Sequence, residues 1–193
     1  MGGHSNVIGF DDAPFAHGHR GDVLLVGAVC ARTRLDGVVS TRVRRDGANA
    51  AKRMVEVIRS SGFARHLQAV LLQGIAVAGF NVVDVHAVHR ALGLPVLVLV
   101  RKRPRLERVR RALFESGPLG RGVRGATRKW QLIERAGIPE PLAGVFVQRV
   151  GLSRTEAQEL IERTRLHGAL PEPIRLAHLI AGGVTTGRSR GRA

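Results

Sequence analysis

The segments NVIGFD at residues 6–11, DVLLVGAVCAR at 22–32 and GVVSTRV at 37–43 decide the fold class, because three β-rich runs precede any stretch with room for a helix. Residues 12–14, Asp-Ala-Pro, end the first run, since a proline cannot donate to a strand ladder. The turn-forming residues 35–37, Leu-Asp-Gly, predict that the second and third runs form a hairpin. We therefore expect a meander of three strands at the start of the chain.

The pattern then changes to helices alternating with strands. A capping box at Ser153 and Glu156 opens one of the helices. A meander followed by alternating segments indicates an α/β protein with a mixed sheet, ribonuclease-H-like rather than doubly wound. Folds of that architecture gather carboxylates from strand ends around a divalent metal. We expect helices over residues 48–60, 84–92, around 106–113, 153–166 and 173–181, strands over 67–72, 95–100 and 142–150, and a mobile basic loop over 117–128.

The composition fits one folded domain. The 193 residues are 44% apolar and 24% charged, which excludes wholesale disorder, and no apolar run reaches the roughly 18 residues of a membrane span. We expect a single domain over residues 1–182 and a basic, flexible tail over 183–193. The N-terminal residues carry no export signal and the lone Cys30 excludes an intramolecular disulfide, so we expect a cytoplasmic protein.

The charge is strongly positive and unevenly placed. The formal net charge is +16, and residues 101–150 hold 13 of the 31 basic residues but only 4 acidic ones. Such a field attracts a polyanion, so we expect a nucleic acid as partner and no membrane. Codon bias is the alternative origin of the 28 arginines, although it exchanges Lys for Arg and does not create net charge. The expected nucleic-acid-binding residues in this region are Arg101, Lys102, Arg103, Arg105, Arg108, Arg124, Arg128 and Lys129.

Carboxylates follow two of the predicted strands. Asp11 and Asp12 end the first strand, and because neighbouring residues point to opposite faces, only one of them faces a given site. Asp11 shares a face with Gly9, which leaves space for a ligand. Asp46 follows the third strand and could bring another carboxylate to the same end of the sheet. Asp11, Asp12 and Asp46 are therefore candidate ligands of a Mg²⁺ ion that supports phosphodiester hydrolysis, with ordinary turns at both places as the alternative.

Two other motifs are less specific. Residues 74–79, GIAVAG, have the glycine spacing of a phosphate loop, but Phe80 and Asn81 replace the required Lys and Ser or Thr, so we reject that interpretation. Asn81 is expected to cap the helix that follows it, with a substrate-facing role as the alternative. Trp130 lies among basic residues and either stacks on a base or packs in the core.

Four stretches of the chain match a known sequence pattern: GFDDAPF at 9–15, LQGIAVAGFNVVD at 72–84, GLPVLVLVRKRP at 93–104 and PEPIRLAHLIA at 171–181. Together they resemble the endonuclease dU family, which is related to endonuclease V. The resemblance covers nearly the whole chain, and its most specific part is the stretch at 72–84. It implies a ribonuclease-H-like fold and a Mg²⁺- or Mn²⁺-dependent DNA-repair endonuclease that acts at deaminated bases such as deoxyuridine, with DNA rather than RNA as partner.

The resemblance also implies site residues. Asp11 matches the carboxylate of the first strand, Asp46 is a second catalytic acid, and His178 is a late acid/base or ligand, with a core or cap role as its alternative. Glu172 shares these alternatives, and Arg175 could face a phosphate. The family pattern Asp-Gly-Ile is replaced here by Gln73-Gly74-Ile75, and Asn49 stands where another Asp is expected. An amide oxygen adds no charge to a metal site. The second hypothesis is therefore a catalytically impaired protein that still binds nucleic acid.

Overall fold

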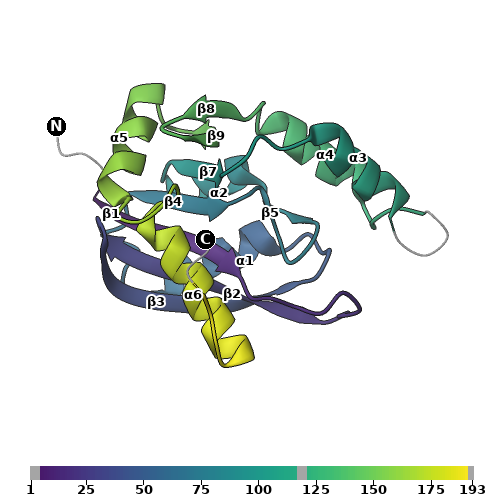
Figure 1. Ribbon diagram of the computed structural model, residues 1–193, viewed down its shortest axis with the longest axis horizontal. Helices are drawn as coiled ribbons and strands as arrows, with labels where there is room; N and C mark the ends of the chain where they lie inside the picture. Colours follow the sequence, from purple (N-terminus) through teal and green to yellow (C-terminus); the bar gives the residue numbers. More distant parts are fainter. Residues whose placement is uncertain (1–4, 117–120, 191–193) are drawn as a thin grey trace.

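The computed structural model describes residues 5–116 and 121–190, which form a seven-stranded mixed sheet in the order β3-β2-β1-β4-β7-β9-β8 (Figure 1). Strands β1, β4 and β7 run parallel, and the other neighbouring pairs are antiparallel. The expected meander at the start of a mixed α/β sheet is confirmed. The bounds are β1 Asn6–Asp12, β2 Asp22–Ala31, β3 Arg34–Arg44, β4 Ala69–Gln73, β7 Val96–Val100, β8 Glu140–Leu142 and β9 Val145–Val150.

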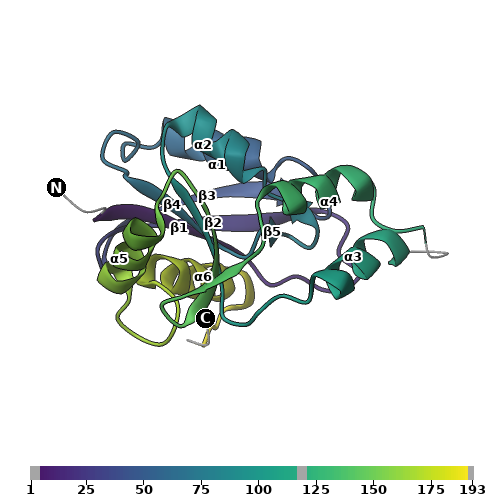
Figure 2. The ribbon, with the colours of Figure 1, turned by 90° about the horizontal axis from the view of Figure 1, so that it is seen from above.

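Helices cover both faces of the sheet, as Figure 2 shows. Helices α1 (Ala50–Ser60) and α2 (Val85–Leu92) lie on one face, and α5 (Arg154–Thr164) and α6 (Glu172–Thr186) lie on the other. The alternation along β1 follows from this arrangement: Ile8 and Phe10 pack in the core that contains α1, whereas Val7 packs in the core that contains α5. Asp11 is in phase with Val7, so its side chain belongs to the face that α6 covers.

Gly9 sets the distance between α6 and β1. A Cβ built at Gly9 would lie 2.5 Å from the carbonyl carbon of Pro173 and 2.6 Å from the backbone nitrogen of Ile174. Only a glycine lets the first turn of α6 approach the strand this closely. The space above Gly9, which the sequence suggested for a ligand, is therefore filled by the helix.

Helices α3 (Leu106–Glu115) and α4 (Ala126–Arg135) form an arm that extends past one end of the sheet (Figure 1). Leu113 and Ile133 pack with Val82 in a small separate core, beside the hairpin of β5 (Ala76–Val77) and β6 (Asn81–Val82). Part of the basic loop predicted over 117–128, residues 117–120, lies outside the described residues. The last part of the predicted loop is helical instead, because α4 begins at Ala126 and packs Ile133 into the small core.

Three predicted boundaries differ from the structure. The turn between β2 and β3 is at residues 32–33, where Arg32 has a φ of 58°, and the strand continues through residues 35–37. Residues 142–150 form two strands, because the chain turns at Ala143 between β8 and β9. The last helix continues to Thr186 instead of ending near residue 181.

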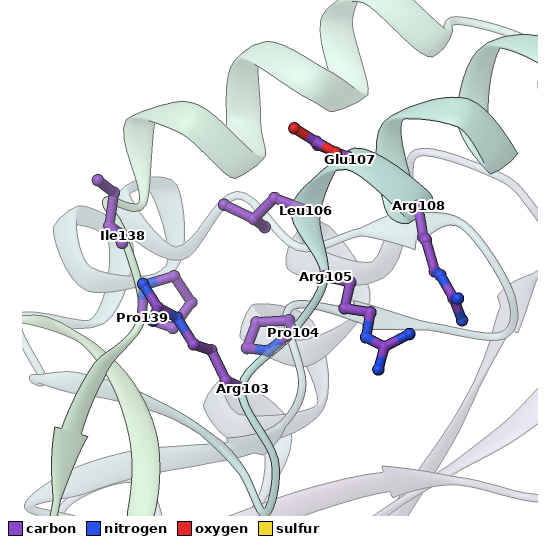
Figure 3. Close-up of a pocket in the computed structure, with 8 residues that line it drawn as sticks. All are labelled: Arg103, Pro104, Arg105, Leu106, Glu107, Arg108, Ile138 and Pro139. Atoms are coloured by element: carbon purple, nitrogen blue, oxygen red, sulfur yellow. The ribbon is translucent and has the colours of Figure 1, made fainter.

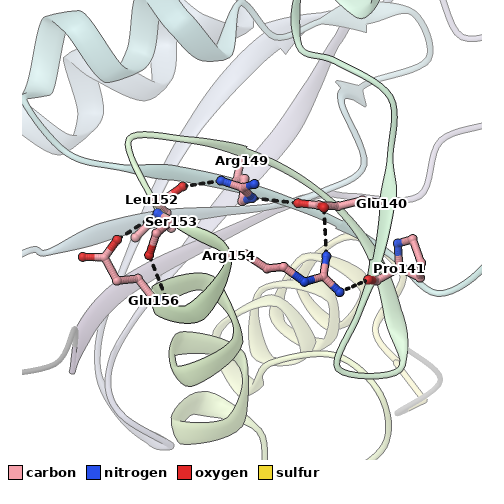
Figure 4. Close-up of polar contacts among 7 residues, drawn as sticks. All are labelled: Glu140, Pro141, Arg149, Leu152, Ser153, Arg154 and Glu156. Carbon is pink, nitrogen blue, oxygen red and sulfur yellow. Dashed lines mark hydrogen bonds and ion pairs between the residues drawn. The ribbon is translucent and has the colours of Figure 1, made fainter.

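An ion-pair network joins β8, β9 and α5 (Figure 4). Glu140 accepts from Arg149 Nε at 2.7 Å and from Arg154 Nη1 at 2.8 Å. The predicted capping box is confirmed, because Ser153 and Glu156 bond each other's backbone at the start of α5. These contacts hold the β8–β9 hairpin against α5.

Within the described residues, no helix combines the length and the apolar character that a membrane span needs.

Candidate active site

A pocket of about 570 Å³ opens where β1, β4 and α6 meet. Asp11 lies near the end of β1 and Gln73 at the end of β4, and the pairing of Phe10 with Leu72 places these two residues side by side on one face. His178 comes from α6, which Gly9 seats on that face. The structure therefore brings together three of the residues that the sequence singled out.

Asp11 and His178 form the central contact of the pocket. Nδ1 of His178 is 2.8 Å from Oδ2 of Asp11. Burial and the neighbouring Asp12 raise the pKa of Asp11 to about 6, although the hydrogen bond with His178 opposes the rise. At neutral pH Asp11 is therefore mostly ionised and can only accept a hydrogen bond, which places the proton on Nδ1 and leaves Nε2 of His178 as the basic nitrogen.

Asp12 also lines the pocket but from a different side of the strand. Burial raises the pKa of its carboxyl, and a hydrogen bond from the backbone of Ala78 partly offsets the rise. Two neighbouring carboxylates are thus held in surroundings that disfavour their negative charge. A bound cation would relieve that cost.

Gln73 supplies a third oxygen. Its Oε1 is buried and has no hydrogen-bond partner within the described part of the chain. A buried amide oxygen left without a partner costs free energy unless a cation or water binds it. Asp11 and Gln73 therefore fit a hard cation that keeps several of its own waters, as Mg²⁺ does, and Asp12 adds negative charge from the other side of the strand. Residues 5–116 and 121–190 contain no group of three or more His, Cys, Asp and Glu side chains close enough to form a protein-only metal cage.

Asp46 does not line this pocket. The backbone of Asp46 is in the left-handed region, with a φ of 52°. Its side-chain Oδ1 accepts a hydrogen bond from the backbone nitrogen of Phe80 at 2.7 Å, and its backbone carbonyl oxygen accepts one from Lys129 Nζ at 2.5 Å. These bonds shape a turn beside a different cavity, of about 430 Å³, which Arg124 and Arg128 also line. Asp46 reaches the predicted end of the sheet, but β2 lies between β3 and β1.

Glu172 and Arg175 pair with each other. Arg175 Nη2 lies 2.6 Å from Oε2 of the buried Glu172, and Arg175 Nε contacts both carboxylate oxygens. Burial alone would raise the pKa of Glu172, but the hydrogen bonds and charge of Arg175 outweigh it and lower the pKa. This pair stabilises the first turn of α6, and neither residue lines the Asp11 pocket.

Most of the expected nucleic-acid-binding residues are exposed. Arg105 and Arg108 extend in the same direction from the start of α3, beside an open cavity of about 400 Å³ with Ile138 and Pro139 on its far wall (Figure 3). Lys129 is the exception, because it is buried and its ammonium bonds the carbonyl oxygen of Asp46. The other exposed members are Arg101, Lys102, Arg103, Arg124 and Arg128.

The fully buried Asn81 and the half-buried Asn49 form an amide pair. Asn81 caps α1 rather than the helix after it, since its Oδ1 accepts from Ala50 N at 3.1 Å and its Nδ2 donates to Asn49 Oδ1 at 2.8 Å. The cap of α2 is Asp84, which accepts from Ala87 N. The prediction for Asn81 was wrong because the backbone N–H that it caps belongs to Ala50, at the start of a helix 31 residues earlier in the chain. Asn49 lies in this pair and does not line the Asp11 pocket.

The sequence did not single out two residues of the pocket, Arg188 and Arg190. They follow α6, in the segment expected to be a flexible tail. The one local signal is Gly187, which has a φ of 73° and ends the helix in the left-handed conformation. Such a glycine marks the point where a chain reverses direction after a helix.

Comparisons with known proteins place this geometry in context. The family model of endonuclease dU matches residues 4–185. A UPF0215 protein of Deinococcus radiodurans is 55% identical over 188 residues, which cover 97% of this chain and 93% of that protein. A solved structure from Archaeoglobus fulgidus, a protein of unknown function, matches with a TM-score of 0.84 at 27% identity and covers 94% of this chain and 99% of that one.

Endonuclease V is a more distant structural neighbour. The enzyme of Ciona intestinalis, solved with a 24mer DNA that contains an inosine followed by a ribo-adenosine, matches with a TM-score of 0.52 at 13% identity. The match covers 90% of this chain and 83% of that one. This likeness shows the fold, and the predicted ribonuclease-H-like class is confirmed.

Proposed function

The chain belongs to the endonuclease dU family, and from this premise we propose that it is a metal-dependent endonuclease that cleaves DNA at deaminated bases, deoxyuridine first among them. The observation that carries the proposal is the Asp11–His178 contact of 2.8 Å beside the unpartnered Gln73 oxygen. A carboxylate, an oriented imidazole and an open oxygen ligand in one pocket are groups that can support phosphodiester hydrolysis by acid–base and metal-ion catalysis.

His178 moves the proton in this proposal. Asp11 holds Nδ1 and so fixes both the tautomer and the orientation of the ring. Nε2 then accepts the proton of the water that attacks the phosphorus, or returns it to the leaving oxygen. Asp11 and Asp12 place negative charge beside His178, which would repel a phosphate of the substrate unless a cation lies between them.

A divalent cation, Mg²⁺ or Mn²⁺, belongs to the proposal. Asp11 and Gln73 are the residues that would hold it, with Asp12 adding negative charge from the other side of the strand, and when bound it would supply charge stabilisation at the phosphodiester oxygens. Only one of these two ligands is anionic, so we expect weak binding that would strengthen when DNA contributes its own phosphate oxygens.

The exposed basic residues bind the DNA backbone. The arm of α3 and α4 carries Arg105, Arg108, Arg124 and Arg128 at or near its surface. Because each phosphate contact releases condensed counterions, affinity should fall steeply with salt concentration.

A cytoplasmic location also belongs to the proposal, since the single Cys30 needs no oxidising compartment.

Cleavage of defined oligonucleotides tests the proposed function. Duplex and single-stranded DNA with one deoxyuridine, one deoxyinosine or no lesion would be incubated with Mg²⁺ or Mn²⁺. We expect metal-dependent nicking at the lesion, lost in Asp11→Asn and retained in Asp36→Asn, whose carboxylate pairs with Arg34 on β3. Equal nicking by Asp11→Asn and wild type would show that the activity lies elsewhere or is a contaminant.

Gln73 favours one alternative, a catalytically impaired protein that binds nucleic acid. An amide in place of a carboxylate removes one charge from the metal site. If the wild-type protein binds but does not nick DNA, and Gln73→Asp nicks it, the alternative holds. Nicking by the wild-type protein, with Gln73→Asp changing only the metal concentration that is needed, would exclude it.

A further inference from the structure

The chain reverses direction after α6 and returns along that helix toward the Asp11 pocket. Gly187 ends α6 with a φ of 73°, and its backbone nitrogen bonds the carbonyl oxygen of Gly183 at 2.9 Å. Thr186 Oγ1 lies 2.7 Å from the carbonyl oxygen of Arg188. These bonds fix the direction of the segment that follows the helix.

Ser189 packs directly against the helix. A Cβ built at Gly182 would lie 2.8 Å from Ser189 Oγ and 3.2 Å from Ser189 Cβ, so the absence of a side chain at Gly182 makes room for the returning segment. Gly182 is buried in the structure. The segment over residues 187–190 is therefore seated on α6, and it differs from the flexible tail that the composition suggested.

The return places two arginines at the pocket. Arg188 and Arg190 line the same cavity as Asp11, Gln73 and His178. Both are exposed, and neither forms an ion pair with any carboxylate of the described residues.

Arg175 and Arg149 differ from these two arginines, because each is bound by a carboxylate. Arg175 on α6 is bound by Glu172, and Arg149 on β9 is bound by Glu140. A guanidinium that is bound in this way cannot offer its full donor set to another anion. Arg188 and Arg190 keep theirs, in a pocket whose other charged groups would bind a cation.

We propose that Arg188 and Arg190 bind phosphates of the DNA backbone that flank the scissile phosphodiester in the Asp11 pocket. Carboxylates and guanidinium groups without an ion-pair partner among the described residues line the same pocket, a combination suited to a phosphate group and its cation together. This inference rests on the proposed function, because it names residues that bind substrate at the same site.

The test measures DNA binding without cleavage. Fluorescence anisotropy of a labelled duplex with one deoxyuridine, in EDTA, gives the dissociation constant over a series of salt concentrations. The double variant Arg188→Gln/Arg190→Gln should reduce the slope of log K against log salt by about 1.8, which is about 60-fold in affinity at 0.1 M salt. The variant Arg188→Lys/Arg190→Lys, which keeps both charges, should retain the slope.

The matched control removes the same charge from the opposite end of the sheet. Arg32 follows β2, and its backbone nitrogen bonds the carbonyl oxygen of Ser5, the residue before β1. Arg65 lies shortly before the start of β4 at Ala69, so both arginines are at the end of the sheet where β1 and β4 begin. Both are exposed. Arg32→Gln/Arg65→Gln should leave the slope nearly unchanged.

Each outcome separates this inference from the proposed function. Equal slopes for the two Gln double variants would overturn the inference and leave the proposed function standing. Tighter binding by Arg188→Gln/Arg190→Gln would also overturn it, because the segment would then block the pocket. If the wild-type protein shows no salt-dependent binding to duplex or single-stranded DNA, the proposed function fails and the inference fails with it.

Discussion

Replacing Gly9 by alanine tests whether the approach of α6 to β1 builds the site. The added Cβ would lie 2.5 Å from the carbonyl carbon of Pro173, whereas ordinary contacts at Cβ are 3.4–4 Å. The first turn of α6 must therefore move by roughly 1 Å, because the atoms in the way are backbone and cannot rotate aside. Overpacking of this kind costs about 1–3 kcal/mol, or a fall in Tm of about 2–12 °C for a domain of this size.

The same shift acts on the site. His178 is carried by α6 and Asp11 by β1, so a movement of roughly 1 Å takes their 2.8 Å contact beyond hydrogen-bonding distance. We expect Gly9→Ala to lose nicking activity at temperatures where it remains folded. Thermal unfolding followed by circular dichroism gives the Tm, and the oligonucleotide assay gives the activity.

Gly183→Ala is the matched control. Gly183 lies in α6, and a Cβ built there meets no atom within 4 Å. Alanine should stabilise the helix by about 0.5–1 kcal/mol and leave activity unchanged. A Gly9→Ala protein with wild-type Tm and wild-type activity would refute the reasoning, because it would show that α6 does not need this close approach.

Three further predictions follow from buried polar groups. The pKa of Asp11 is about 6 in the folded protein and 3.8 in the unfolded chain, so at pH values between these two folding takes up a proton. The free energy of unfolding of the metal-free protein should therefore rise by about 1 kcal/mol from this group as pH falls from 7 to 5. Denaturant titration at both pH values should show the rise in wild type, and its persistence in Asp11→Asn would contradict the assignment. Burial raises the pKa of Cys30 to about 12, so roughly 1 thiol in 10⁴ is ionised at pH 8. A thiol reagent should therefore label Cys30 only after the protein unfolds, and rapid labelling of the native protein would contradict this. Asn81→Ala removes the buried cap of α1 and leaves Ala50 N without its acceptor, so it should lower the free energy of unfolding by about 2–4 kcal/mol. A decrease below about 0.5 kcal/mol in denaturant titration would show that the amide is dispensable.

The order of elements was predictable from the sequence because it depends on local periodicity. Strand alternation alone placed Asp11 on the face of Gly9 and Val7, and the structure has it there. The contact with His178 was not predictable from spacing, because it depends on how closely α6 approaches β1. That distance is set by one glycine whose role appears only when the helix is seen against it.

Asp46 shows where reasoning from strand ends stops. β3 and β1 run in the same direction, so their last residues do lie at one end of the sheet. The strand between them adds two spacings, about 10 Å, which is too far for two carboxylates to share one ion. The order of strands decides the outcome, and the sequence patterns carry that order only indirectly.

The two arginines beyond α6 were missed for a different reason. A basic segment without apolar residues predicts a solvated tail. The segment is held by the hydrogen bond from Thr186 Oγ1 to the carbonyl oxygen of Arg188 and by the contact of Ser189 with Gly182, which need no apolar side chain. Helix α4 was missed in a similar way, since its N-cap is Gly125 and its first turn has no acidic residue.

Single-turnover cleavage by two isosteric variants tests most directly whether the Asp11 pocket is the reaction site. Asp11→Asn and Asp46→Asn each remove one negative charge, and the amide oxygen at position 46 can still accept from Phe80 N. With a deoxyuridine duplex and Mn²⁺, we expect Asp11→Asn to slow cleavage at least about 100-fold and Asp46→Asn to stay within a few-fold of wild type. The reverse order of effects, or no cleavage by the wild-type protein with any metal, would contradict the assignment of this pocket as a nuclease site.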